Sequence, residues 1–239
     1  MINQYTDITE YYDLWVQSGY YDYQNMAQEA YSVVGNGRQV LELGVGTGLM
    51  AQKYLEIDPT CEFTGIDFTP SMLQIAQKRV GNKAKLIEAD AVTMDLNRKF
   101  DVAISNGGVW IIFDGGNQWE LGTHIPGMEA NLQALVNVGN HLPKGGLFLL
   151  NLQQPHKGYE KPLSEEIIYS QSVEELEDTQ DYHILRKSYF FKKDGEIMAQ
   201  EHLTLTFFKQ YFYQEMFTEA GFDFQGLSNG NCFVIYQKR

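Results

Sequence analysis

The 239-residue chain has little cysteine and no long hydrophobic run. Its two cysteines, Cys61 and Cys232, cannot build a disulfide framework, and they do not form the CxxC pattern of a metal or cluster site. No window approaches the about 18 uninterrupted apolar residues that a membrane helix requires. The first ten residues lack the basic and apolar segments of a signal peptide. These absences predict a cytoplasmic protein with reduced thiols and no membrane partner.

Positive charge is also scarce, with 18 Lys and Arg against 31 Asp and Glu and a formal net charge of −13. Such a surface repels a phosphate backbone, so no nucleic-acid partner is expected. The five histidines have no metal-ligand spacing, and no metal is expected. What the chain does have is 44% hydrophobic and 13% aromatic residues. This composition predicts a folded domain, with room for a small annex.

Between residues 38 and 152, short apolar runs alternate with stretches of helical periodicity. Buried strands that alternate with helices are typical of a parallel α/β sheet. The expected strands are Gln39–Leu43, Glu62–Ile66, Lys85–Glu88, Phe100–Ser105 and Gly146–Leu152. The expected helices are Leu49–Glu56, Pro70–Val80 and Met128–His141.

After residue 155 the runs become long, alternating and rich in β-branched and aromatic residues. Asp194-Gly195 between two such runs is a strong hairpin signal. The runs it joins are Tyr182–Lys193 and Glu196–Phe208, with Glu165–Gln171 as a possible third strand. A helix at Gln210–Ala220, stopping at Gly221, and closing strands at Phe222–Gln225 and Cys232–Gln237 are expected to follow.

The most informative segment is Glu42-Leu43-Gly44-Val45-Gly46-Thr47-Gly48, which ends the first expected strand. Three glycines in five residues let the backbone turn tightly and approach a ligand. The segment does not fit the GxGxxG dinucleotide pattern, because Leu49 stands where the third glycine belongs. Glu42 lies where it would be close to a bound phosphate. The loop therefore favours a cationic ligand.

Two further acids follow the next two expected strands. Asp67 ends the second strand, where a carboxylate can accept both hydroxyls of a ribose. Asp90 follows the third strand, where an adenine amino group could donate to it, although an Asp in this place is also often a helix N-cap. An adenosine that bears a positive sulfonium and an amino group matches these acids better than a phosphate ester does. S-adenosylmethionine is such a ligand.

These residues resemble the first three motifs of the class I S-adenosylmethionine-dependent methyltransferases, and Phe100–Asn106 and Leu142–Gly146 resemble the fourth and fifth. The resemblance implies a Rossmann-like α/β fold, a mostly parallel sheet with helices on both faces. It implies S-adenosylmethionine as cofactor and S-adenosylhomocysteine as product. The cofactor-binding candidates are Tyr23, Glu42, Gly44, Gly46, Gly48, Asp67, Phe68, Met72, Asp90, Ala91 and Asn106, of which Phe68 and Met72 could equally be ordinary core.

The two ends of the chain resemble small-molecule N-methyltransferases that act on amino sugars and, more loosely, glycine N-methyltransferases. The tyrosine-rich start, with Tyr12-Asp13-Leu14-Trp15, resembles their N-terminal lid, and His202–Thr206 with Phe217–Phe222 resembles their small antiparallel sheet and following helix. Residues 106–129 depart from the sugar-enzyme pattern, so no particular sugar is implied. The catalytic candidates are Tyr12, Tyr23, His202 and Tyr211, and the substrate-binding candidates are Trp15 and Trp110.

The expected reaction is N-methylation of a small-molecule amine by in-line displacement. The core motifs do not identify the acceptor atom, so O- or C-methylation of a small metabolite and a non-catalytic cofactor-binding protein are alternatives. Either a monomer or a homodimer is compatible with the sequence. We expect a lid at residues 1–36, a cofactor-binding core at 37–154, an antiparallel β insertion that caps the substrate at 155–208, and a C-terminal helix with strands that complete the core at 209–239.

Overall fold

The computed structural model describes residues 5–36 and 38–239. The first four residues of the expected lid, and Gly37 at the expected start of the core, lie outside the described residues. The helices are α1 (Thr9–Val16), α2 (Tyr23–Val34), α3 (Leu49–Ile57), α4 (Pro70–Val80), a 3-10 turn (Gly81–Lys83), α5 (Met128–Asn140) and α6 (Gln210–Glu219). The strands are β1 (Gln39–Leu43), β2 (Glu62–Asp67), β3 (Ala84–Glu88), β4 (Val102–Ser105), β5 (Trp110–Asp114), β6 (Trp119–Thr123), β7 (Leu147–Gln153), β8 (Tyr159–Pro162), β9 (Ile168–Asp178), β10 (Tyr182–Lys193), β11 (Glu196–Lys209), β12 (Phe222–Leu227) and β13 (Phe233–Lys238).

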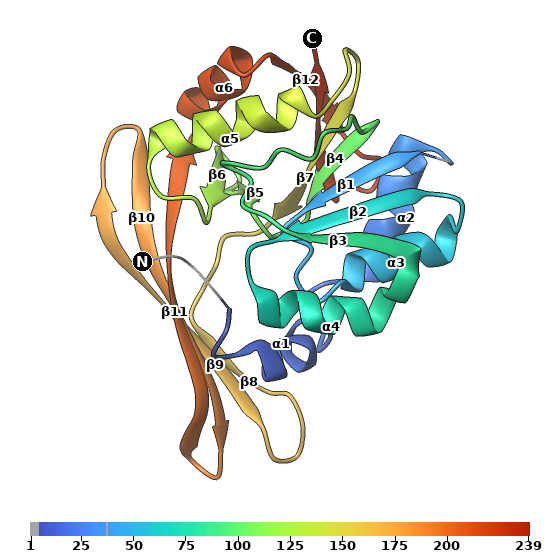
Figure 1. Ribbon diagram of the computed structural model, residues 1–239. Helices are drawn as coiled ribbons and strands as arrows, with labels where there is room; N and C mark the ends of the chain where they lie inside the picture. Colours follow the sequence, from blue (N-terminus) through green and yellow to red (C-terminus); the bar gives the residue numbers. More distant parts are fainter. Residues whose placement is uncertain (1–4, 37) are drawn as a thin grey trace.

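The core sheet has the order β3-β2-β1-β4-β7, with all neighbours parallel. β13 then runs antiparallel beside β7, and β12 pairs with β13. Helices α5 and α6 cover one face of this sheet, while α2, α3 and α4 lie on the other (Figure 1). Each face buries its own apolar cluster, because parallel strands between two helical layers are enclosed on both sides. The carboxyl ends of β1, β2 and β4 therefore meet at one edge.

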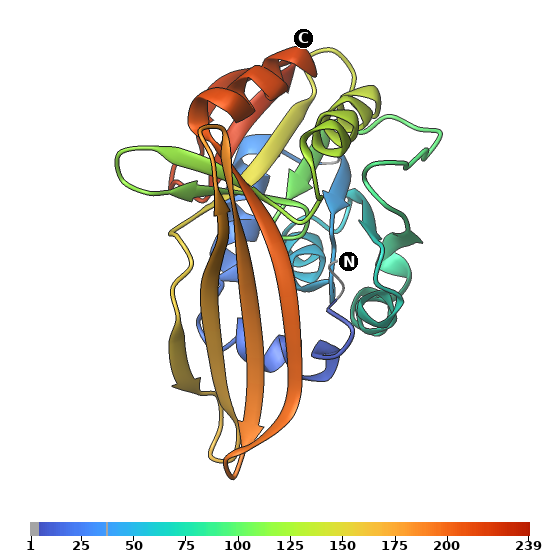
Figure 2. The same cartoon turned by 90° about the vertical axis from the view of Figure 1, so that its left-hand side faces the viewer.

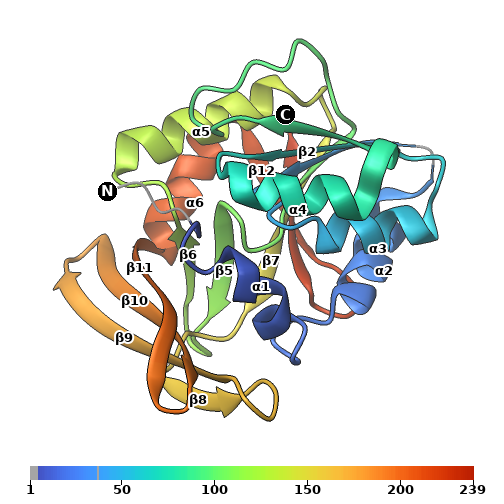
Figure 3. The same ribbon diagram turned by 60° about the horizontal axis from the view of Figure 1, so that its bottom comes forward.

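A second, largely antiparallel sheet is joined to the core sheet at the carboxyl end of β7. The last residues of β7 pair with β5, and the order continues β6-β11-β10-β9-β8. Its long strands β9, β10 and β11, here called the wall, lie beside the core (Figure 2). Helix α1 lies between this wall and α4 (Figures 1 and 3). Trp15 and Val16 of α1 are buried in one apolar cluster with Leu49 of the core and Tyr189 of the wall, so the lid is packed on both sheets.

The Rossmann-like fold, the N-terminal helical lid and the antiparallel annex agree with the prediction from the sequence. The hairpin between β10 and β11 turns at Asp194 and Gly195, whose φ angles are 52° and 83°. Both central residues of this turn have positive φ, which is the conformation that Asp-Gly favours. Helix α6 also ends as expected, since Gly221 follows it with a φ of 82°.

Two parts of the second sheet differ from the expectation. Residues 106–129, in which no strand was expected, contain the β5–β6 hairpin, so the antiparallel sheet also takes strands from within the expected core. β9 extends from Ile168 to Asp178, well beyond Gln171. Its second half is acidic and exposed and so lacks an alternating apolar pattern, but it pairs with β10 along its length, with one register shift between Ile184 and Leu185. An acidic edge is one way in which proteins protect the border of a sheet.

Candidate functional site

The glycine loop lies against the turn after β4, so that two backbones touch. Gly44 has a φ of 70°, and a Cβ on it would come within 2.5 Å of the Gly108 Cα. A Cβ on Gly108 would meet the Gly44 Cα at 2.6 Å and the Leu43 carbonyl oxygen at 2.7 Å. Backbone atoms cannot yield as a side chain can. These glycines are therefore required for the close approach, which brings Asn106 of the second turn beside the loop.

One hollow beside the glycine loop contains two unpaired acceptors. It is lined by Tyr12, Tyr23, Glu42 and Asn106, among others, together with Gly44 and Gly46. Glu42 is 2% exposed, and its Oε2 atom and the Asn106 Oδ1 atom have no hydrogen-bond partner among the described residues. Burial, and secondly the nearby Asp67, raise the pKa of Glu42 well above its usual value. Two buried acceptors facing one space fit a ligand that brings a positive, hydrogen-donating group.

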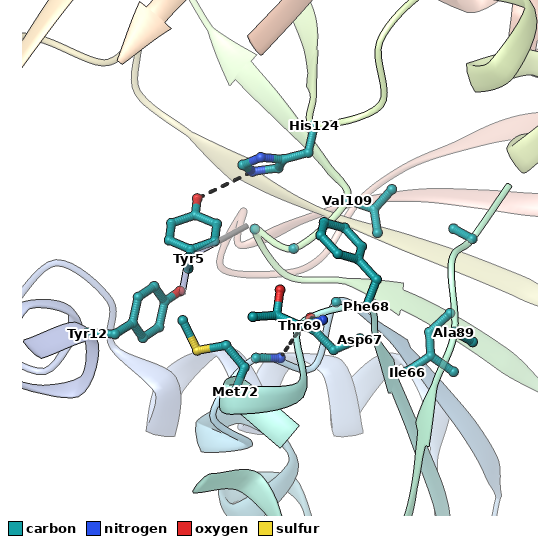
Figure 4. A pocket seen from close by; sticks show the side chains of 15 residues that line it. Tyr5, Tyr12, Ile66, Asp67, Phe68, Thr69, Met72, Ala89, Val109 and His124 are labelled. Atoms are coloured by element: carbon teal, nitrogen blue, oxygen red, sulfur yellow. Dashed lines mark hydrogen bonds between the residues drawn. The ribbon is translucent and has the colours of Figure 1, made fainter. Parts of the chain in front are cut away.

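Asp67 lies at the entrance to a second part of the same site (Figure 4). Its carboxylate accepts hydrogen bonds from the backbone N–H of Gly46, at 2.9 Å, and of Thr69, at 2.8 Å. Burial raises the pKa of Asp67, although these N–H donors act in the opposite direction. Beyond Asp67 the lining is apolar, with Phe68, Met72, Ala89 and Ala91 among the residues that line it. Together with the unpaired acceptors, this space, the cofactor hollow, fits an adenosine attached to a cationic group.

Two of the expected cofactor residues lie differently. The exposed Asp90 carboxylate accepts the Val92 N–H at 2.8 Å and does not line the hollow. It caps a local turn, and no helix begins there, so Asp90 is not the helix N-cap considered for it from the sequence either. Gly48 begins α3 with a φ of 79°, and a Cβ there would meet Ala76 of α4 at 3.1 Å. Its role in the structure is helix packing, while Gly44 and Gly46 line the hollow.

Asp13 holds helix α1 against the glycine loop and α4. The Asp13 carboxylate accepts a hydrogen bond from the Thr47 hydroxyl, at 2.6 Å, and forms an ion pair with Arg79 of α4. The Thr9 hydroxyl on the same helix lies 2.9 Å from the Ser71 hydroxyl. These contacts hold α1 in place, and Tyr12, the residue before Asp13, lines both the cofactor hollow and a second space.

That second space, the aromatic chamber, lies between the lid, the β5–β6 hairpin and the wall of long strands. It shares Tyr5, Tyr12, Gly107 and His124 with the cofactor hollow, so the two spaces meet at these residues. The remaining lining is largely aromatic and includes one lysine. Its members are Trp15, Tyr20, Tyr21, Ile111, Phe113, Gly122, Thr123, His156, Lys187, Tyr189, Leu205 and Phe207.

Burial shifts the pKa values of titratable groups in the two spaces, and these shifts determine which groups are charged near pH 7. Burial raises the pKa of Tyr12 and of Tyr23 well above 10, so both remain protonated phenols at neutral pH. Burial, with the Lys187 charge as a second cause, lowers the pKa of His124 to about 4. His124 is thus a neutral imidazole near pH 7, and its Nε2 lies 3.5 Å from the Tyr5 hydroxyl (Figure 4).

Three candidates from the sequence line neither of the two spaces. Trp110 is fully buried in the apolar core and lines neither space, with its indole N–H donating to Asn131 at 2.8 Å. His202 lies on the outer face of β11, exposed, 2.7 Å from the Ser188 hydroxyl. Tyr211 is an exposed residue of α6, and its hydroxyl donates to the Gln180 carbonyl and the Asp181 carboxylate. Trp15, by contrast, lines the aromatic chamber.

Sequence reasoning did not identify several residues of the chamber as site candidates, notably Tyr5, Tyr21, His124, His156, Lys187 and Tyr189. His124 and Lys187 occur singly, without a motif. A signal was available for Lys187, which stands at an inward position of an alternating strand between Leu185 and Tyr189. A charge at an inward position is rare unless it is paired or functional.

Comparison with known proteins agrees with this geometry. Residues 40–120 match a family model described as a methyltransferase domain. A tRNA1(Val) (adenine(37)-N6)-methyltransferase of Flavobacteriaceae bacterium (strain 3519-10) is 33% identical over 78 residues, 30% of this chain and 34% of that protein. A malonyl-[acyl-carrier protein] O-methyltransferase of Bacillus cereus is 26% identical over 155 residues, 62% of this chain and 51% of that protein. The chain thus matches a third to a half of the length of these relatives.

Solved structures match over nearly the whole chain. CalS10, an amino pentose methyltransferase from Micromonospora echinaspora, has a TM-score of 0.71 at 17% identity, with 95% of this chain and 96% of that chain covered. The sugar N-methyltransferase KedS8 from Streptoalloteichus sp ATCC 53650 has a TM-score of 0.64 at 16% identity, with 95% and 92% covered. The fold is that of the class I methyltransferases. The prediction of a Rossmann-like class I methyltransferase fold is therefore confirmed.

Two of the expected absences concern the structure directly. Within residues 5–36 and 38–239, no helix is long and apolar enough to cross a membrane. In the same ranges, no group of three or more His, Cys, Asp or Glu side chains could hold a metal ion.

Proposed function

We propose that the protein transfers a methyl group from S-adenosylmethionine to the nitrogen of a small-molecule amine. The observation that carries this proposal is the junction of the two spaces at Tyr12 and His124. One space offers buried acid groups to a cationic nucleoside, and the other is a chamber enclosed by the lid. Structural likeness to enzymes described as an amino pentose methyltransferase and a sugar N-methyltransferase supports nitrogen as the acceptor.

The residues that line the cofactor hollow fit each part of S-adenosylmethionine. In this proposal, Glu42 and Asn106 bind the amino group of the methionine end, since their buried oxygens lack donors. Tyr23 lines the same space, and Gly44 and Gly46 let the backbone approach the ligand. Asp67 accepts the ribose hydroxyls. The adenine lies among the apolar side chains Phe68, Met72 and Ala91.

We expect cofactor binding to release a proton from Glu42. Without ligand, burial raises the pKa of this carboxyl well above its usual value and so favours its protonated form. A cation placed beside it favours the carboxylate and lowers the pKa again. Calorimetric titration with S-adenosylmethionine in two buffers of different ionisation enthalpy should give different binding enthalpies. For Glu42→Gln the two enthalpies should agree, and a buffer dependence that persists in this variant would contradict the assignment.

Asp67 and Asp90 form a matched pair for testing the ribose contact. Asp67→Ala should weaken S-adenosylmethionine binding by about 1 to 3 kcal/mol, the cost of a lost hydrogen bond to a charged group. Asp90→Ala should leave the affinity within about twofold, because this exposed carboxylate does not line the hollow. Calorimetry on both variants measures the contrast. Unchanged binding by Asp67→Ala would show that the ribose is held elsewhere.

Bound S-adenosylmethionine supplies an electrophilic methyl group and a neutral thioether leaving group, so the protein has no leaving group to protonate. The chain's part is to hold an amine in line with that methyl group, and such positioning can supply roughly 7 to 11 kcal/mol of the barrier. An ammonium has no lone pair to attack with, and its proton must leave first. His124 is the proton acceptor in this proposal, because it is neutral and lies at the junction. Tyr12 acts as a positioning hydrogen-bond partner.

His124→Phe should lower kcat by about 10²- to 10⁴-fold, the usual contribution of a positioned acid or base. The affinity for S-adenosylmethionine should stay near that of the unchanged protein, since His124 lies where the two spaces meet and is not among the residues assigned to the cofactor. His124→Gln, which keeps a hydrogen-bond acceptor but cannot take up a proton, should retain the KM for the amine and lose kcat. His202→Phe is the matched control on the outer surface and should be fully active.

The function itself is tested by incubating the protein with S-adenosylmethionine and panels of amines, phenols and carboxylic acids, with S-adenosylhomocysteine release as the readout. Turnover confined to amines supports the proposal. Turnover of carboxylic acids supports the alternative of O-methylation, which the malonyl-[acyl-carrier protein] O-methyltransferase relatives favour. Cofactor binding with no turnover in any panel would instead identify a non-catalytic binding protein.

We further propose that the substrate is not a nucleic acid, because the net charge of −13 opposes a phosphate backbone. The tRNA-modifying relative matches 78 residues, 30% of this chain, so it supplies no counterpart for the chamber walls. The choice between monomer and homodimer, and the cytoplasmic location, stay predictions. Gel filtration measures the first.

A further inference from the structure

Lys187 is a buried cation inside the aromatic chamber. It lies on β10 and pairs with Leu203 of β11, so it is on the inner face of the wall together with Tyr189. Its side chain is 1% exposed. The Nζ atom lies 4.9 Å from the ring centre of Tyr189, 5.5 Å from that of Tyr20 and 5.6 Å from that of Trp15. The ammonium is thus surrounded by the faces of three aromatic rings.

In the part of the chain that the structure describes, this lysine has no counter-ion. Among residues 5–36 and 38–239, no carboxylate forms an ion pair with Nζ and no polar atom accepts a hydrogen bond from it. None of the remaining five residues is acidic. Aromatic faces attract a cation by about 1 to 2 kcal/mol, much less than the hydration lost on burial. A buried ammonium in this state lacks an anion.

The chamber places Lys187 on the substrate side of the junction. It lines the chamber but not the cofactor hollow, whereas Tyr5 and His124 line both. The ring of Tyr5 lies 6.0 Å from that of Tyr189, which in turn contacts Lys187. A molecule with its reacting nitrogen at His124 therefore extends along Tyr5 and Tyr189 toward the ammonium.

We propose that Lys187 binds a carboxylate of the methyl-accepting substrate, so that the substrate is an amine with one carboxylate and an apolar or aromatic body. This inference rests on the proposed function of the same site. One lysine neutralises one negative charge. A phosphate dianion would leave an excess charge between aromatic walls, where the other basic groups, His124 and His156, are held neutral by burial. The stacked aromatic lining fits the apolar body.

The binding test uses benzoate, benzamide and phenyl phosphate as probes in the presence of S-adenosylhomocysteine. Calorimetry should show benzoate bound roughly 10- to 150-fold more tightly than benzamide, the range for a hydrogen-bonded charged pair. Lys187→Met should abolish the preference, and Lys187→Arg should keep part of it. Lys192→Met, on the same strand but paired with Glu160 at the surface, should behave like the unchanged protein.

Three results would overturn the inference: equal or undetectable binding of benzoate and benzamide, a preference that survives in Lys187→Met, or tighter binding of phenyl phosphate than of benzoate. Affinity for S-adenosylhomocysteine, measured on each variant, shows whether the variant is folded. The inference and the proposed function fail separately. Amines methylated without regard to a carboxylate would end the inference alone, while a Lys187-dependent benzoate preference without turnover of any amine would end the proposed function.

Discussion

Gly108→Ala should lower the free energy of unfolding by about 2 to 4 kcal/mol and weaken S-adenosylmethionine binding at least about tenfold. The added Cβ would lie 2.6 Å from the Gly44 Cα and 2.7 Å from the Leu43 carbonyl oxygen, far inside van der Waals contact. Both neighbours are backbone atoms of the glycine loop, so the loop itself must move. Because that loop brings Gly46 to Asp67, the displacement also disturbs the cofactor hollow.

Gly158→Ala is the matched control, since a Cβ there would meet the Gln171 carbonyl oxygen at an ordinary 3.4 Å. Urea unfolding gives the stability of both variants, and calorimetry gives their affinity for S-adenosylmethionine. Equal stabilities would mean that the contact between the loop and the turn after β4 is looser than the structure has it. A stability loss without a loss of affinity would separate the contact from the cofactor hollow.

The cofactor hollow could be predicted from the sequence because its chemistry is local. Gly44, Gly46 and Glu42 adjoin one strand end, and Asp67 ends the neighbouring strand. In a parallel sheet such ends meet at one edge whatever the rest of the chain does. Apart from the β5–β6 hairpin, the strands and helices of residues 38–152 were predictable for the same reason, since each apolar run reports on its own burial.

The aromatic chamber could not be predicted because its walls come from distant segments whose orientation depends on register. Trp110 and Val109 are neighbours in the chain, yet Val109 lines the cofactor hollow while Trp110 lines neither space and donates a hydrogen bond to the buried Asn131. On β11, the neighbours His202 and Leu203 likewise lie on opposite faces, His202 exposed and Leu203 buried. A shift of one residue in a strand reverses every side chain, and no local pattern fixes that choice for a strand with large residues on both faces.

Lys187→Met should make the ligand-free protein more stable at neutral pH, the opposite of most core substitutions. Burial lowers the pKa of Lys187 from 10.5 to about 7, and at about 1.4 kcal/mol per tenfold change in proton affinity this costs the folded state about 5 kcal/mol when the lysine is fully protonated, and about 4 kcal/mol at pH 7, where part of it is deprotonated. Methionine has a similar length and no charge, and it packs well against aromatic rings. The variant loses the cation–ring contacts of the lysine, which stabilise the folded protein by about 1 to 2 kcal/mol. The expected gain is about 2 to 3 kcal/mol.

The advantage of the variant should depend on pH with a definite sign. Below about pH 7 the lysine is protonated in both the folded and the unfolded chain, so the full cost of burial is present. Between about pH 7 and 10.5 the folded chain binds fewer protons than the unfolded one, and the cost falls as the pH rises. Urea unfolding of both proteins at pH 6 and pH 9.5 measures this difference, in which the titration of the tyrosines cancels. A constant difference would show that the ammonium is solvated or paired. If the difference becomes smaller from pH 6 to pH 9.5, and Lys187→Met no longer prefers benzoate, then the chamber keeps a buried charge for its ligand at the expense of stability.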